Sequence, residues 1–155
     1  MNTNVTPLQM ACEAMTIANR GTRYETHLLD AMLDETGTVV STYEPTIASS
    51  FDLSDEAYNA IAEGMRMVAA DLSGEYRVTD LVYIKTGTPQ VTTDRTHHCF
   101  IGYVMKDGEP EIAIAMMVED GQTCQRFLRR ILLAYDKSKY PEKYGADTTG
   151  EASAD

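Results

Sequence analysis

The segment from Glu111 to Val118 constrains the fold most, because a strand there is apolar on both faces. Alternate residues of a strand point to opposite sides. One face carries the larger side chains, Ile112, Ile114, Met116 and Val118, and the other carries Ala113, Ala115 and Met117. Both faces must therefore be covered. The small alanines allow a helix to approach closely, and we expect the helix predicted next, Gln122 to Tyr135, to do so.

Periodicity predicts the other elements. Apolar spacing predicts helices from Thr6-Pro7 to Gly21 and from Ser54 to Ser73-Gly74. Alternation predicts strands at 24–33 and 39–43, with a connector at 45–53, and strands at 81–88 and 98–105. The order is helix, hairpin, helix, three strands, helix. It predicts an α/β fold, in the layered α+β sense, with an antiparallel sheet flanked by helices.

The size and charge of the chain exclude several classes of protein. Its 155 residues suit one domain. The net charge of −11 argues against a nucleic-acid partner, because phosphate binding needs clustered Lys and Arg. We expect neither a signal peptide nor a membrane span. Residues 136–155 are predicted to be a disordered tail after a domain at 1–135.

No metal or cofactor is predicted. Cys12, Cys99 and Cys124 are far apart in the sequence and are interpreted as small buried thiols. His97 and His98 are adjacent, so on a strand they point to opposite faces and would not share a metal. The sequence has no phosphate-binding loop and no dinucleotide-binding fingerprint.

The motif Lys85-Thr86-Gly87-Thr88 lies on the first of the last three strands. Alone it fits an ordinary exposed edge strand better than a functional site. A Lys-Thr-Gly strand followed by two antiparallel strands and a helix is, however, the layout of serine transpeptidases and β-lactamases.

Three further stretches resemble penicillin-binding proteins over about residues 4–135. They are 4–11 with 17–21, 62–68, and 100–103 with 111–121. In that family a serine of a Ser-x-x-Lys motif attacks the D-Ala-D-Ala end of a peptidoglycan stem peptide, and penicillins acylate the same serine. The resemblance implies that Lys85, Thr86 and Gly87 belong to the catalytic wall and that Thr88 binds substrate. The Thr88 N–H would be an oxyanion-hole donor, and Gly87 would let the ligand lie against the strand.

The sequence also departs from the family pattern. None of its seven serines is followed by Lys at the third position or by Asn at the second, and Ile84 stands where the family usually has Gly. We therefore expect a partial transpeptidase fold, lacking the N-terminal strands and the nucleophile-bearing helical region, and inactive by itself. A non-catalytic module with a carboxylate-binding cleft wall, and an interaction protein that uses an open strand edge, are the alternatives.

The resemblance also implies partners. The complete domain would bind a stem peptide or a β-lactam, and this chain would need the missing N-terminal half. Without that half, the strand from Glu111 to Val118 would be an open edge, and we expect it to invite a homodimer. The family works outside the cytoplasmic membrane. As written, a chain without an anchor would stay inside.

Overall fold

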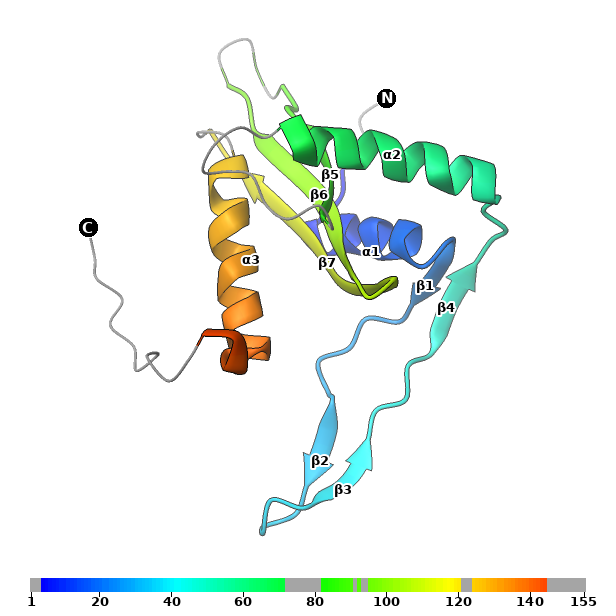
Figure 1. The fold of residues 1–155 in the computed structure, drawn as a ribbon, viewed down its shortest axis with the longest axis vertical. Helices are drawn as coiled ribbons and strands as arrows, with labels where there is room; N and C mark the ends of the chain where they lie inside the picture. Colours follow the sequence, from blue (N-terminus) through cyan, green and yellow to red (C-terminus); the bar gives the residue numbers. More distant parts are fainter. Residues whose placement is uncertain (1–3, 72–81, 91, 93–94, 121–123, 145–155) are drawn as a thin grey trace, which may run out of the picture.

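The computed structural model describes residues 4–71, 82–90, 92, 95–120 and 124–144. Its centre is an antiparallel sheet of three strands, β5 (Val82–Gly87), β6 (His98–Lys106) and β7 (Glu109–Val118), in the order β5-β6-β7. Helices lie on both sides of this sheet (Figure 1). The predicted α/β class and antiparallel sheet are confirmed.

Helix α1 (Pro7–Ala18) begins as the sequence predicts. The Thr6 hydroxyl accepts a hydrogen bond from the Gln9 N–H, and the Gln9 side chain accepts one from the Thr6 N–H, which together form a capping box. Helix α2 (Asp55–Asp71) begins with Ser54 Oγ accepting from the Ala57 N–H. Its predicted end at Ser73-Gly74 lies outside the described residues.

The two faces of the sheet carry separate clusters. On one face, Leu128 and Leu132 of α3 (Gln125–Lys139) pack against Phe100 and Ile114. On the other face, Ala18 of α1 and Met65 of α2 pack against the buried Tyr103. The register between β5 and β6 decides which side chains lie on each face. Ile84 pairs with Gly102, and Tyr103 pairs with Tyr83.

The expectation for the alanines of β7 was half right. Ala113 pairs with Tyr103 and Ala115 with Ile101, so both lie on the face opposite Ile114. Helix α1 covers that face, whereas α3 packs on the isoleucine side. The small side chains therefore admit a helix from the start of the chain. The helix that follows β7 in the sequence is therefore not the one that covers its alanine face.

Residues 22–50 form a long two-stranded ribbon that projects beyond the body (Figure 1). Strand β1 (Thr22–Tyr24) pairs with β4 (Ile47–Ser50), and β2 (Ala31–Leu33) pairs with β3 (Val39–Thr42). The predicted hairpin is confirmed for β2 and β3, but the strand predicted at 24–33 is wrong in part, because residues 25–30 between β1 and β2 are not strand. The connector predicted at 45–53 is wrong in part, because it contains β4.

The two legs of this ribbon meet at Gly21. The Phe51 N–H donates to the Gly21 carbonyl at 3.2 Å. Gly21 has φ +97°, and a Cβ there would lie 2.3 Å from the Phe51 carbonyl oxygen. Only glycine fits this left-handed, crowded position.

The predicted tail boundary is also wrong. Helix α3 continues to Lys139, and a 3-10 turn, η2 (Pro141–Tyr144), follows it. Aromatic residues explain the difference, because Tyr140 and Tyr144 hydrogen-bond to acidic residues of β7 and α3. Residues 145–155 lie outside the described part of the chain.

Candidate active-site wall

Strand β5 holds the Lys-Thr-Gly motif at the outer edge of the three-stranded sheet. Val82 and Ile84 are buried beneath it, with Ala69 of α2 in the same cluster. Residues Lys85 and Thr88 are exposed, and residues Thr86 and Gly87 are half-buried. Lys85 Nζ donates to the Thr86 carbonyl. The strand is thus fixed by its buried residues while the motif faces solvent.

Ile84, the departure from the family pattern, is accommodated in the core. It pairs with Gly102, and a Cβ on Gly102 would lie 3.2 Å from Ile84 Cγ1. The Ile84 side chain thus occupies the space that Gly102 leaves on the face covered by α3. Lys85, one residue later, points to the opposite face. The isoleucine therefore does not occupy the face that carries the lysine.

Gly87 has a steric contact that the sequence did not predict. It pairs with Cys99 of β6, and a Cβ on Gly87 would lie 2.8 Å from Cys99 Sγ. A side chain at residue 87 would therefore displace the Cys99 thiol. Cys99 and Cys12 are half-buried and Cys124 is buried, so the predicted burial holds fully only for Cys124. Burial raises the pKa of Cys124 to about 11.

A polar cluster at the same end of the sheet was missed by sequence reasoning. Arg95 forms a bidentate ion pair with Asp120, with Nε 2.8 Å from Oδ1. The Asp120 N–H donates to His97 Nδ1 at 3.2 Å, and the His97 N–H donates to the Pro89 carbonyl at 2.9 Å. The hydrogen bond from Arg95 lowers the pKa of Asp120. The cluster joins the segment after β5 to the turn after β7. Arg95 and Asp120 are 25 residues apart, so no local sequence pattern predicts the cluster.

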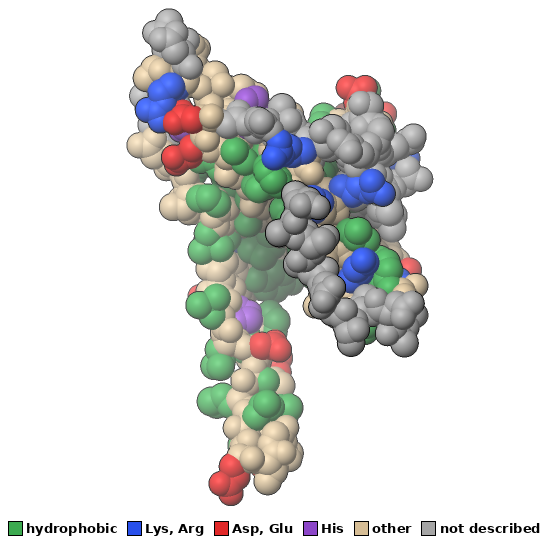
Figure 2. Space-filling view, turned by 90° about the vertical axis from the view of Figure 1, so that its left-hand side faces the viewer, with side chains coloured by type: hydrophobic (Ala, Val, Ile, Leu, Met, Phe, Trp, Pro, Cys, Tyr) green, Lys and Arg blue, Asp and Glu red, His purple; other side chains and the backbone are tan. Residues whose placement is uncertain are grey.

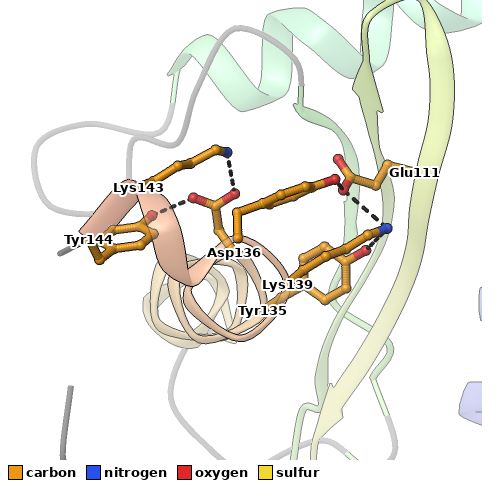
Figure 3. Close-up of polar contacts among 7 residues, drawn as sticks. Glu111, Tyr135, Asp136, Lys139, Lys143 and Tyr144 are labelled. Atoms are coloured by element: carbon orange, nitrogen blue, oxygen red, sulfur yellow. Dashed lines mark hydrogen bonds and ion pairs between the residues drawn. The ribbon is translucent and has the colours of Figure 1, made fainter. Parts of the chain in front are cut away.

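A second polar cluster clamps the end of α3 to β7 (Figure 3). Tyr140 donates a hydrogen bond to Glu111, and Lys139 Nζ lies 3.3 Å from the same carboxylate. Burial opposes ionisation of Glu111, but these two partners outweigh it and hold its pKa below the usual value.

Replacing Tyr140 by phenylalanine is expected to lower the free energy of unfolding by about 1–2 kcal/mol near neutral pH, because a partly buried carboxylate loses a donor. Because the pKa of Glu111 is lower in the folded state, its ionised carboxylate stabilises the fold at pH values above the pKa of an unfolded Glu, about 4.3. The difference should therefore shrink as pH falls through the native pKa. Urea unfolding at several pH values measures it. Tyr24→Phe, with no hydroxyl partner among the described residues, is the control, and equal losses in both variants would contradict the clamp.

A cavity of about 570 Å³ lies at the end of the sheet where β6 turns into β7, bounded by Val82, Lys106 and Leu132. Lys85 and Thr88 are not part of its lining, so we do not assign it to the motif. Among the described residues no cluster of His, Cys, Asp or Glu could hold a metal ion, and no helix is long and apolar enough to cross a membrane.

Most of this chain is similar to known proteins. Residues 2–140 match the model of the penicillin binding protein transpeptidase domain. Penicillin-binding protein 2A of Bacillus subtilis (strain 168) is 28% identical over a match that covers 73% of this chain and 18% of that protein.

Solved structures share the fold. Penicillin-binding protein A of Mycobacterium tuberculosis, as an imipenem acyl-enzyme complex, matches with a TM-score of 0.73 and 21% identity, over 87% of this chain and 32% of its own. Penicillin-binding protein 2B of Streptococcus pneumoniae (strain R6) matches with a TM-score of 0.71 and 24% identity, over 88% of this chain and 25% of its own.

The chain thus spans a third or less of each of these relatives. The family model nevertheless covers nearly all of its described residues. The Lys-Thr-Gly strand, the sheet order and the two covering layers of helices agree with that match. The chain belongs to the penicillin-binding protein transpeptidase domain family.

Proposed function

We propose that this chain forms one wall of the acyl-transfer site of a peptidoglycan D,D-transpeptidase. The observation that carries the proposal is the exposure of Lys85 on β5, opposite the buried Val82 and Ile84, together with the exposure of Thr88 directly after the strand. A buried motif would have had no ligand to meet. An edge strand also leaves backbone groups free to pair with an extended peptide.

Each motif residue has a role in this proposal. Lys85 supplies positive charge near the substrate carboxylate and joins the proton network. Thr86 and Thr88 offer hydroxyl groups to the same carboxylate. The Thr88 N–H donates to the oxyanion, and losing one such donor typically costs on the order of 10²–10³ in rate. Gly87 keeps this stretch of β5 free of a side chain.

The attacking serine comes from outside these 155 residues in this proposal. Its hydroxyl attacks the carbonyl between the two D-alanines, the terminal D-Ala leaves, and an ester forms with the serine. An amine of a second stem peptide then displaces the serine and forms the crosslink. Penicillin-binding protein A of M. tuberculosis forms acyl-enzyme complexes with imipenem and penicillin G, which supports β-lactam binding by the complete domain. The complete protein would act on the outer side of the cytoplasmic membrane.

The absence of Ser-x-x-Lys from the 155 residues favours a second candidate, a non-catalytic module that binds the peptide carboxylate. The two functions share the wall and differ in whether acylation follows. The coding DNA upstream of the Met1 codon distinguishes them, because a frame encoding Ser-x-x-Lys and Ser-x-Asn there supports the transpeptidase.

Either function predicts that the chain binds a peptide ending in D-Ala-D-Ala, and that Lys85→Ala weakens binding about tenfold or more. A charge-assisted hydrogen bond contributes about 1.5–3 kcal/mol, and 1.4 kcal/mol is a factor of ten. Isothermal titration calorimetry measures the dissociation constant. Arg66→Ala, an exposed residue of α2, is the matched control. Equal affinity of wild type and the Lys85 variant would remove the assigned wall.

A further inference from the structure

The ribbon at residues 25–46, here called the arm, exposes a large apolar surface. Every residue of β3 is exposed, and Leu28 is fully so. The exposed apolar side chains within the arm are Leu28, Leu29, Met32, Leu33, Val39 and Val40. An isolated two-stranded hairpin is at best marginally stable in water. Apolar side chains gathered on such a ribbon indicate a surface that a partner covers.

The arm is also purely acidic. Its five charged residues are Glu25, Asp30, Asp34, Glu35 and Glu44, and the sequence has no Lys or Arg from residue 24 to residue 65. None of the five forms an ion pair with a described residue. Figure 2 shows hydrophobic and acidic side chains along the arm and no basic ones on the face in view. A partner for this surface must be both apolar and basic.

Helix α3 presents such a surface. Arg126, Arg130, Leu133 and Lys137 are exposed and spaced by four, three and four residues. That spacing places them on one side of the helix, opposite the buried Leu128 and Leu132. We call these four residues the basic stripe.

The positive charges of the basic stripe are not neutralised by ion pairs with described residues. Its three cations form no ion pair with a described residue, whereas Lys139 and Lys143 are paired with Glu111 and Asp136. Six of the thirteen basic residues of the chain lie between residues 124 and 144. The basic stripe therefore combines positive charge with an exposed leucine at its centre.

We propose that the arm docks on the basic stripe of a second copy of this chain, and that the two copies exchange arms in a two-fold pair. The lengths are comparable. Arg126 to Lys137 covers about 16 Å of helix, and the stretch from Asp30 to Asp34, which contains β2, covers about 13 Å of extended chain. A two-fold arrangement closes the assembly, because each copy gives one arm and receives one. The proposal does not depend on the transpeptidase function.

Charge reversal tests this contact. Asp30→Lys with Glu35→Lys changes the charge of residues 30–35 from −3 to +1, although the whole arm stays at −1. Arg126→Glu with Arg130→Glu changes the charge of the basic stripe from +3 to −1. Each pair is expected to raise the dimer dissociation constant on the order of tenfold or more, because like charges then face each other. All four substitutions together restore opposite signs and the wild-type net charge, so they should restore dimerisation. Sedimentation velocity over a concentration series gives the constants, and circular dichroism confirms that each variant is folded.

The matched control is Glu13→Lys with Glu63→Lys, at exposed positions of α1 and α2. It raises the net charge by the same amount as the arm variant and reduces overall repulsion between copies. The dimer dissociation constant of this control should therefore stay equal or fall. That result would show that the arm variant acts through its local contact and not through the net charge of the chain. A chain that is monomeric at every concentration overturns the proposal. So does a dimer that is equally stable in all variants, the result expected if copies pair through β7.

Discussion

Replacing Gly102 by alanine is expected to destabilise the chain by about 3 kcal/mol, more than a substitution at an exposed site. A Cβ at this position would lie 2.6 Å from the Tyr83 carbonyl oxygen and 3.2 Å from Ile84 Cγ1. The carbonyl belongs to the neighbouring strand and cannot move without displacing β5. Overpacking costs roughly 1–3 kcal/mol, and total stabilities of domains are only about 5–15 kcal/mol.

The midpoint of urea unfolding measures this loss. Gly64→Ala is the matched control, because a Cβ at Gly64 in α2 has no atom within 4 Å. That change should raise stability by up to about 1 kcal/mol, since alanine is favoured over glycine inside a helix. The two glycine-to-alanine substitutions are thus expected to change the free energy of unfolding in opposite directions. If Gly102→Ala unfolded at the wild-type midpoint, the register that pairs Gly102 with Ile84 would be wrong.

The 155-residue polypeptide is expected to form no covalent adduct with a fluorescent penicillin. An activated serine needs a base within hydrogen-bond reach. Among the described serines, Ser49 accepts from Arg23, Ser54 caps α2, and none bonds to a lysine. Lys85 donates to a backbone carbonyl. Without an activated nucleophile, the β-lactam has nothing to acylate.

Labelling followed by denaturing electrophoresis measures this outcome. A protein that forms a penicillin G acyl-enzyme, such as penicillin-binding protein A of M. tuberculosis, is the positive control. A fluorescent band from the 155-residue chain that survives denaturation would overturn the assignment of the serine to another segment. A longer polypeptide that includes Ser-x-x-Lys should label, and Lys85→Ala should slow its acylation.

Local signals predicted the starts of the helices and the sheet strands well. Thr6 and Ser54 cap the two helices at the expected residues, since their hydroxyls meet free N–H groups within three residues. The apolar residues of β7 predicted that both of its faces are covered. This prediction needed only the alternation of side chains along one strand. These features depend on contacts that are short in sequence.

Features that depend on distant partners were missed. Strand β4 contains two serines and forms because β1 lies opposite it, at partners 23 to 28 residues away in the sequence. The turn at 141–144 is held by aromatic side chains that reach Glu111 and Asp136. The pair of Arg95 and Asp120 beside the motif also joins separate loops. Periodicity carries no information about such partners.

The candidate wall itself was identified from the motif and the family resemblance. Exposure of Lys85 and Thr88 agrees with it, and the contact between Gly87 and Cys99 is a further feature that the motif did not predict. The sequence could not show this, because the Gly87–Cys99 pairing depends on the register between β5 and β6.

The junction at Gly21 has a consequence for how such chains diversify. The segment between it and Phe51 leaves and re-enters the body at one hydrogen-bonded point. Changing the number of residues in a loop closed in this way costs only about 0.6 kcal/mol for each doubling. Insertions and deletions between these two residues should therefore accumulate in homologues with little penalty to the sheet. The length of the hairpin can then evolve separately from the proposed active-site wall.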